Sequence, residues 1–572
     1  MKFFCVFCVL CASVVNAFAL DREAFTFTNY DLDVRVEPEQ QRLAVRGRIT
    51  LRNDSASPQK NVFLQISSSL DWRSIQVGGK AVQFVSQPYL SDIDHTGALS
   101  EAIVTLPQPI APNGMVEVEV GYEGTIPLDI TRLTGIGVPE DAAKHTDWDQ
   151  IGKSFSAVRG IGYVVWYPVA TESADLADGN SLFETVGRWK EKEAASQAVL
   201  NFCTTSLTGL MNDEHGSAAG TSPSSTTAGA DCEEHTFAPL GQTTPAFVLS
   251  DYSTLDRPAV AIHYLPGHKP AAEDYALAAE LVAPFVAEWF GAPRGKAVVA
   301  ELADPQAPPF ESGSMLLTPL SPSADSRLTQ MTAVHQLTHA AFPSSRSWIY
   351  EGLAHFAQAA YREQQSGRKA ALDFMAQHRT AVANAENTIK AEHDKGSAAR
   401  ESLINTSVEE LYRSKAMYVW WMLHDMVGEA ALKKALAAYR AEEDKAPSYV
   451  QRLVEAQSKR DLEWFFDDWV YRDRGLPDFR VESAFPRATV GGGYVVTVSV
   501  ENLGEAGTEV PVTLRVEGGE ITKRLEVRAK SKAVVRIEAP TAPQEVMVND
   551  GSVPESDMSN NILKIEVGTL PK

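Results

Sequence analysis

The sequence predicts a multidomain α+β protein, with a β-rich N-terminal domain, a mostly helical middle domain and a C-terminal β-sandwich. Near the start of the chain, apolar residues alternate with polar ones, a pattern typical of half-buried strands. In the middle they recur at helical spacing, and after Gly475-Leu476-Pro477 the period returns to two. With 572 residues, 44% of them apolar, the chain can bury several cores.

The first residues predict a signal peptide. Met1-Lys2 precedes an apolar run over 3–15 that is too short to span a bilayer. Ala17-Phe18-Ala19 then has the A-x-A pattern of a signal-peptidase site. We therefore expect residues 1–19 to be removed and the mature chain to begin at Leu20, in the periplasm or outside the cell. No later stretch is long and apolar enough for a transmembrane helix, so no integral membrane segment is expected after signal removal.

Residues 20–250 are expected to form the β-rich domain. The turn-like segment Pro38-Glu39-Gln40-Gln41 separates two alternating segments, and Pro112-Asn113-Gly114 precedes a third. The segment 141–166 fits neither period. The alternating positions of the three predicted strands are Tyr30, Leu32, Val34 and Val36, then Leu43, Val45, Gly47, Ile49 and Leu51, then Val116, Val118, Val120 and Tyr122.

Cys203 and Cys232 are the two cysteines that remain once the signal peptide is removed. An even pair in an exported chain predicts a disulfide, and two free thiols are the alternative. The segment 212–230 between them is rich in Ser, Thr, Gly and Ala, which predicts a flexible loop. Neither cysteine belongs to a C-x-x-C motif, so we do not expect them to bind metal.

Residues 251–475 are expected to be mostly helical, with further helices over 370–395, 412–427 and 462–469. Pro284 should kink the first of these helices. Its helical positions are Tyr275, Ala278, Leu281, Val282, Phe285 and Trp289.

After them, residues 476–572 show short alternating segments with Gly-rich turns, which indicates an immunoglobulin-like sandwich. Its expected role is packing, without a ligand.

The segment His335-Gln336-Leu337-Thr338-His339 predicts a metal site. Histidines at i and i+4 leave the same face of a helix, and two neutral imidazoles suit one tetrahedral Zn²⁺. In H-E-x-x-H enzymes the residue after the first His is a Glu that takes a proton from the metal-bound water. Here it is Gln336, which has a similar shape but no basic electron pair to offer. We expect it to occupy the position of the base above the metal, with its amide directed into the cleft.

A third ligand is expected on the following helix. Pro343 ends the first helix, and Glu351 lies near the apolar side of the segment Trp348 to Phe356. The alternative is that His335 and His339 are ordinary hydrogen-bonded histidines and that Glu351 is a solvated helix residue.

These motifs resemble the gluzincin aminopeptidases of the aminopeptidase N family, in which H-E-x-x-H precedes an N-E-G-F-A helix. The segment 311–318 lies where that family has a G-A-M-E-N substrate strand, and 412–416 resembles its Y-x-K-G helix. The resemblance implies a thermolysin-like middle domain and a zinc ion held by His335, His339 and Glu351. It also implies a peptide held by Gly313 and Met315.

The departures from the family pattern fall on catalytic positions. Gln336 replaces the general base, and Leu316 and Leu317 stand where the substrate strand has Glu and Asn. Arg413 occupies the position of the transition-state tyrosine, with Tyr412 one residue out of register. The eleven residues between His339 and the Glu of the second helix are also fewer than in the family.

Three functions are compatible with the sequence. The first is an exported zinc-binding pseudopeptidase, or a strongly attenuated metallopeptidase, that binds a peptide or a protein partner. The second is an active zinc aminopeptidase with another base, for which Glu311 is the first candidate. The third is a metal-free structural protein. The net charge of −22 argues against nucleic acid and anionic membranes as partners.

Overall fold

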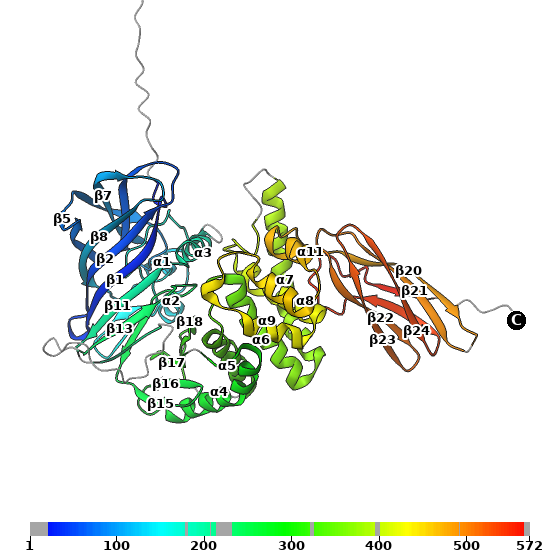
Figure 1. Ribbon diagram of the computed structural model, residues 1–572. Coiled ribbons are helices and arrows are strands. Elements are labelled where there is room, and N and C mark those ends of the chain that lie inside the picture. Colours follow the sequence, from blue (N-terminus) through cyan, green and yellow to red (C-terminus); the bar gives the residue numbers. More distant parts are fainter. Residues whose placement is uncertain are drawn as a thin grey trace, which may run out of the picture.

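The computed structural model describes residues 21–177, 181–205, 207–212, 231–293, 295–320, 325–394, 401–490 and 492–565. A β-rich region, a helical region and a β-sandwich follow one another along an elongated molecule (Figure 1). This arrangement confirms the multidomain α+β class expected from the changes of period. The predicted signal peptide and residues 213–230 of the predicted loop lie outside the described residues.

The three strands predicted near the start of the chain are neighbours in one mixed sheet, as β1, β2 and β8. The apolar residues of β1 are buried, and most of the polar residues between them are not, so the alternation sets which face packs on the core. The strand order is β13-β11-β1-β2-β8-β4-β5. The bounds are β13 Asp231–Phe237, β11 Gln197–Thr204, β1 Phe25–Glu37, β2 Arg42–Asn53, β8 Met115–Thr125, β4 Leu70–Val77 and β5 Lys80–Ala81.

Two smaller sheets, in the orders β3-β7-β6 and β12-β14-β10-β9, add residues to the same core. The segment 141–166 fitted no period because it combines the end of a short helix, two short strands and irregular chain. The strand bounds are β3 Gln59–Ser67, β7 Ala98–Ile110, β6 Phe84–Leu90, β12 Thr208–Met211, β14 Phe247–Ser250, β10 Phe155–Val158 and β9 Gln150–Ile151. The helices of this region are η1 Pro38–Gln40, α1 Thr131–Gly135, α2 Glu140–Thr146 and α3 Ser181–Glu193.

The predicted disulfide is present. Cys203 in β11 and Cys232 in β13 face each other in the antiparallel pair, and their sulfur atoms are bonded. The bond therefore joins two neighbouring strands at the edge of the large sheet, at the base of the chain segment that connects them.

The middle region is mostly helical, as expected, but it also contains a five-stranded sheet in the order β15-β16-β17-β19-β18. The sequence pattern did not reveal this sheet because its strands have only three to five residues. The bounds are β15 Ser253–Asp256, β16 Val260–Tyr264, β17 Ala297–Glu301, β19 Met315–Thr318 and β18 Phe310–Ser312.

The predicted helices are confirmed, and α4 continues through Pro284. Three of them pack around the candidate site: α5, α6 and the π-helical turn η2. The bounds are α4 Lys269–Phe290, α5 Ser326–Ala341, α6 Ser347–Ser366, α7 Arg368–Asp394, η2 Glu410–Lys415, α8 Ala416–Val427, α9 Glu429–Ala438, η3 Ala441–Glu443, α10 Tyr449–Ser458, α11 Glu463–Phe466 and η4 Asp467–Tyr471.

The C-terminal region is a sandwich of two antiparallel sheets, β20-β21-β24 and β23-β22-β25-β26. Alternating valines and leucines of both sheets fill one core, which continues into the core of the helical region. The bounds are β20 Phe479–Ala488, β21 Tyr494–Asn502, β24 Lys532–Ala539, β23 Gly519–Val527, β22 Thr508–Val516, β25 Pro543–Val548 and β26 Ile562–Lys564.

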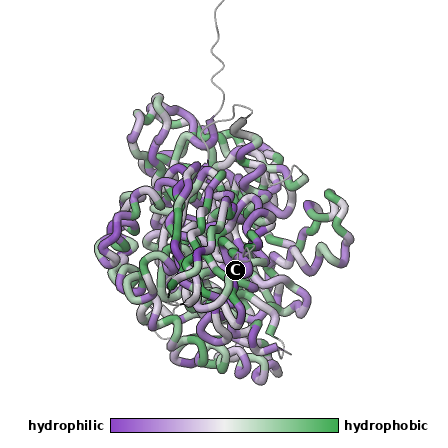
Figure 2. The backbone as a smooth tube through the Cα atoms, turned by 90° about the vertical axis from the view of Figure 1, so that its right-hand side faces the viewer, coloured by the Kyte–Doolittle hydropathy of each residue, from purple (hydrophilic) through white to green (hydrophobic). Residues whose placement is uncertain are grey.

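Hydrophobic and hydrophilic residues alternate along the described backbone in Figure 2. This mixture agrees with the three clusters of buried apolar side chains among the described residues. Among the described residues, no helix has both the length and the apolar character needed to cross a membrane.

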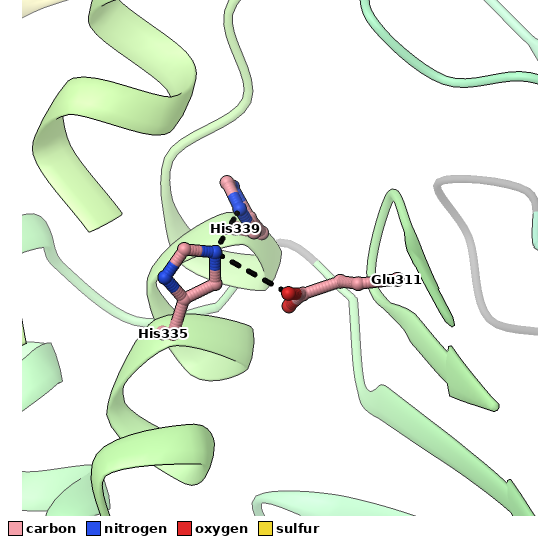
Figure 3. Close-up of side chains that lie close together, drawn as sticks. All are labelled: Glu311, His335 and His339. Carbon is pink, nitrogen blue, oxygen red and sulfur yellow. Dashed lines mark hydrogen bonds and ion pairs between the residues drawn. The ribbon is translucent and has the colours of Figure 1, made fainter. Parts of the chain in front are cut away.

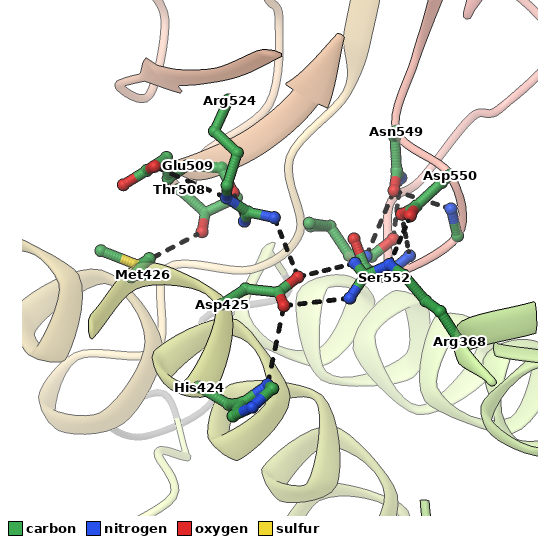
Figure 4. Close-up of polar contacts among 12 residues, drawn as sticks. Arg368, His424, Asp425, Met426, Thr508, Glu509, Arg524, Asn549, Asp550 and Ser552 are labelled. Carbon is green, nitrogen blue, oxygen red and sulfur yellow. Dashed lines mark hydrogen bonds and ion pairs between the residues drawn. The ribbon is translucent and has the colours of Figure 1, made fainter. Parts of the chain in front are cut away.

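A cluster of ion pairs around Asp425 connects the sandwich to helices α7 and α8 (Figure 4). Asp425, at the end of α8, accepts hydrogen bonds from Arg368 of α7 at 2.7 Å and from Arg524 of β23 at 2.9 Å. Arg368 also reaches Asp550 of the sandwich at 3.0 Å. Although burial favours the neutral carboxyl, hydrogen bonds from His424 and Arg368 hold the pKa of Asp425 well below its usual range.

Replacing Asp425 by Asn is expected to lower the free energy of unfolding by about 2–4 kcal/mol, because two arginines would lose their shared carboxylate inside the junction. Denaturant unfolding followed by circular dichroism measures this. Asp373→Asn is the matched control, since Asp373 pairs with Lys369 on the exposed face of α7 and should contribute little. Equal effects of the two substitutions would contradict a stabilising role for the cluster.

Candidate metal centre

Helix α5 places His335 and His339 one turn apart on its buried face. Their side chains are 8% and 1% exposed, and their Nε2 atoms lie 3.0 Å apart (Figure 3). The helix begins after Asp325, whose side chain accepts a hydrogen bond from the backbone N–H of Arg327. The i, i+4 spacing therefore brings the two imidazoles together as the sequence predicted.

Two carboxylates reach this pair from different elements. Glu351 of α6 places its oxygens 3.8 Å from the Nε2 atoms of both His335 and His339. Glu311 of β18 places one oxygen 3.3 Å from the Nε2 of His335 (Figure 3). Helices α5 and α6 and the strand β18 thus converge on a small volume that contains two nitrogen and two carboxylate donors.

The spacing of these donors fits a metal ion. Ligand atoms about 2.0–2.1 Å from a tetrahedral Zn²⁺ lie about 3.3 Å from one another. The separations of 3.0 to 3.8 Å found here lie around that value. Glu311, His335 and His339 offer ligand atoms that all lie within 4.8 Å of one another. Small side-chain adjustments would bring Glu351 to the same point.

His355 is a neighbouring donor that sequence reasoning did not select. It lies one turn after Glu351 on α6, its ring centroid is 4.9 Å from that of His335, and together these three residues form a second group within 4.8 Å. Both of its ring nitrogens are buried, and neither has a hydrogen-bond partner among the described residues. The E-x-x-x-H spacing on a helix was the signal that could have identified it.

Burial keeps both imidazoles neutral and able to bind metal. It lowers the pKa of His335 to about 4, and together with the neighbouring His335 it lowers the pKa of His339 to about 3. At an exposed histidine, protons compete with a metal near the ordinary pKa of about 6.5. The buried position moves that competition to a more acidic range.

The two carboxyl groups have opposite electrostatic environments. Burial and the nearby charge of Glu351 raise the pKa of Glu311 to about 8. Burial also opposes ionisation of Glu351, but the guanidinium of Arg413 and the histidines hold its pKa well below the usual range. Glu351 is therefore ionised at neutral pH, whereas Glu311 without a metal holds a proton.

Arg413 is the direct partner of Glu351. It lies in the π-helical turn η2, and its Nε donates to Glu351 Oε2 at 3.0 Å. The neighbouring Tyr412 is half-buried against the helical core, and burial raises the pKa of its hydroxyl. The structure thus places Arg413 as the cation that is hydrogen-bonded to Glu351.

Lys415, two residues after Arg413, is held by ion pairs with residues that lie outside the histidine and carboxylate cluster. The ammonium of Lys415 is fully buried and forms ion pairs with Glu386 of α7 and with Asp473 in the link to the sandwich. The turn that presents Arg413 is therefore anchored by two other parts of the chain.

Gln336 has the hydrogen bonds of a structural residue. The hydroxyl of Tyr275 donates to its Oε1 at 2.6 Å, and its Nε2 donates to the carbonyl oxygens of Val298 at 2.8 Å and Ser314 at 3.2 Å. The expectation that this amide points into the cleft was wrong. A primary amide carries two N–H donors, and the starts of β17 and β19 present two carbonyl oxygens that take both.

A cavity of about 260 Å³ opens beside His339. Gly313, at a φ of +62° in the turn between β18 and β19, lines it, and Tyr350 stacks on the His339 ring at 3.8 Å. Met315, the other predicted substrate-binding residue, is 1% exposed and packs in a core behind this turn. The remaining lining residues include Gln242, Thr243, Ser314 and Ser344.

Comparison with known proteins shows similarity at the level of fold. No family model and no curated protein matches the sequence. Aminopeptidase A from Legionella pneumophila, solved in complex with aspartic acid, shares 12% identity and a TM-score of 0.58 over 93% of this chain, which spans 59% of that protein. An M1 zinc metallopeptidase from Deinococcus radiodurans, solved as a mutant bound to a Tyr-Ser-Ala substrate, shares 16% identity and a TM-score of 0.46 over 80% of this chain and 96% of that one.

Gln336→Glu is expected to destabilise the metal-free protein by about 2–4 kcal/mol, because the carboxylate would face two carbonyl oxygens with no hydrogen to donate. Thermal and denaturant unfolding in the presence of a chelator measure this. Gln41→Glu is the control, since Gln41 is exposed and donates to a single carbonyl, that of Ile151. A neutral result for Gln336→Glu would show that the amide does not tie α5 to the sheet.

Proposed function

We propose that this chain is an exported, aminopeptidase-like zinc-binding protein that binds a peptide or protein ligand and has little or no peptidase activity. The observation that carries the proposal is that His335 Nε2 and His339 Nε2 lie 3.0 Å apart, each with an oxygen of Glu351 at 3.8 Å, while Gln336 is bonded to the sheet. The site thus has the donors for a metal ion and lacks the neighbouring base.

The chemistry of the donors favours zinc. Neutral imidazoles and carboxylates are ordinary ligands of Zn²⁺, and the donor spacing fits its tetrahedral geometry. When bound, zinc would act as a Lewis acid on any group that reached an open coordination position. His335 and His339 would supply nitrogen ligands, and Glu351 an oxygen ligand. The disulfide fits an oxidising compartment, in agreement with the proposed export.

The weakness of catalysis follows from the position of Gln336. General-base catalysis contributes roughly 10²–10⁴-fold to an enzymatic rate. Both polar atoms of the Gln336 side chain are engaged by Tyr275 and by strand carbonyls, and an amide cannot accept a proton from water at neutral pH. The residue after the first histidine therefore holds the helix in place instead of activating a nucleophile.

The ligand is proposed to occupy the cavity beside His339. Its volume of about 260 Å³ suits the end of a peptide or one large side chain. Gly313 and Ser314 line it with backbone from the turn at the end of β18, which could hold an extended chain, and the Tyr350 ring forms an apolar wall.

Two other functions each have one observation in their favour. Glu311, 3.3 Å from His335, could act as a base in place of Gln336, which would make the protein an active zinc aminopeptidase. Arg413 already neutralises Glu351, which favours a metal-free scaffold.

The purified mature protein is expected to bind about one Zn²⁺ per chain, and His339→Ala should abolish binding because it removes one of the two imidazoles. Metal analysis after dialysis against zinc measures the stoichiometry. A fluorogenic panel of peptides with free amino termini, with and without chelator, should show no metal-dependent hydrolysis by the unmodified protein. Robust chelator-sensitive turnover would support the active-enzyme function, and absence of zinc would support the scaffold.

In the same assay, Gln336→Glu is expected to raise hydrolysis by much less than the roughly 10²-fold or more that restoring a base alone would give. Leu316 and Leu317 cannot provide the substrate contacts of a Glu and an Asn, and Arg413 stands where a neutral hydroxyl is needed. A rise of that full size would show that the missing base was the only defect.

Arg413→Gln is expected to increase zinc affinity by about tenfold or more, because it removes a positive charge that competes with the metal for Glu351. Competition with a chelating dye measures the change. Arg472→Gln removes an equal charge from an exposed site paired with Asp467 and should leave the affinity unchanged. A loss of affinity in Arg413→Gln would mean that this arginine orients Glu351 for the metal.

A further inference from the structure

Glu311 has no assigned role in the proposed zinc site, although it is one of the residues nearest to the two histidines. It comes from a different element from the other donors, the strand β18, and its oxygen lies 3.3 Å from His335 Nε2 (Figure 3). Within the described part of the chain, Glu311, His335 and His339 form one of the two groups of side chains that could hold a metal ion.

The position of Glu311 is fixed by the strand and its turn. In the β18–β19 pair, Glu311 lies opposite Leu316 and Ser312 lies opposite Met315. The hydroxyl of Ser312 donates to the carbonyl oxygen of Thr244 and accepts from its N–H, both at 3.2 Å. The Glu311 side chain extends toward α5 from an edge strand that pairs with β19 and is bonded to Thr244 through Ser312 (Figure 3).

The second oxygen of Glu311 is an unsatisfied acceptor. Oε1 is buried and has no hydrogen-bond partner among the described residues. A buried carboxyl oxygen without a donor is costly, and such groups in native structures usually have an ion or a water as partner. The neighbouring cation, Arg413, is already engaged by Glu351 and Glu409. A metal ion at this point would give Oε1 of Glu311 the partner that it lacks.

We infer that Glu311 is a direct metal ligand and that, with His335, His339 and Glu351, it closes the coordination sphere of the zinc. This inference rests on the zinc binding proposed above and adds the identity of the fourth ligand. Hydrolytic zinc sites have three protein ligands and leave the fourth position to water, whereas structural sites have four protein ligands. As a fourth ligand, Glu311 would take the position that water holds in a hydrolytic site.

The closed centre explains the other features of the cluster. Two carboxylates and one Zn²⁺ sum to zero charge, which suits a buried position, and Arg413 remains as the outer partner of Glu351. The metal joins β18, α5 and α6, three elements that lie apart in the sequence. A peptide in the cavity beside His339 would then contact the imidazole and Tyr350 without reaching an open metal position.

The test compares zinc and cobalt binding by the unmodified protein, Glu311→Gln and Glu273→Gln. Glu273 lies on the half-exposed side of α4 and controls for the loss of a carboxylate. We expect Glu311→Gln to weaken zinc binding by about 10–100-fold or more, since it removes a ligand, and Glu273→Gln to leave it unchanged. Melting curves recorded in the presence of a chelator confirm that each variant is folded. Glu311→Asp, which keeps the charge but shortens the side chain, should also weaken zinc binding.

The spectrum of the Co²⁺-substituted protein reports whether a coordination position is open. In the unmodified protein, added azide should leave the visible spectrum unchanged, and in Glu311→Gln it should alter the spectrum by binding at the freed position. Unchanged zinc affinity in Glu311→Gln, or an azide response of the unmodified protein, would overturn the inference while leaving zinc binding intact. An unmodified protein that binds no zinc would instead overturn the proposed function together with this inference.

Discussion

Charge neutralisation in a buried volume is the constraint on which the centre of this molecule depends. Glu311 and Glu351 approach two imidazoles that burial keeps neutral, so the histidines cannot supply the compensating charge. Arg413 supplies one positive charge from η2, and its ion pair with Glu351 explains why that group ionises despite its burial. One oxygen of Glu311 is buried and has no hydrogen-bond partner among the described residues, which is the physical reason for proposing a cation at this point.

Gln336 shows how an amide in place of a carboxylate changes what a helix residue can bond to. In this chain the residue after the first histidine lies against the starts of β17 and β19, where the carbonyl oxygens of Val298 and Ser314 face it. An amide can donate to both, and Tyr275 completes its bonding. A carboxylate could not donate there and would have to turn toward a metal. The same position therefore favours either packing or catalysis, and in this chain it favours packing.

Local spacing made a large part of the structure predictable. The period of two identified β1, β2 and β8, and the H-x-x-x-H spacing placed His335 beside His339. The direction of the Gln336 amide was not predictable, because it depends on carbonyl oxygens of residues 298 and 314, which reach the helix only in the folded sheet. The approach of Glu311 has the same cause, since β18 and β19 are too short to show a period.

The buried ammonium of Lys415 connects the turn that carries Arg413 to the link that leads into the sandwich. It lies two residues beyond Arg413 and forms ion pairs with Glu386 and with Asp473, which belongs to that link. Asp425, Arg368 and Arg524 hold the same two regions together at a separate point. A displacement of the sandwich relative to the helices would therefore strain the ion pairs of Lys415, and through them it would act on the turn that presents Arg413 to Glu351.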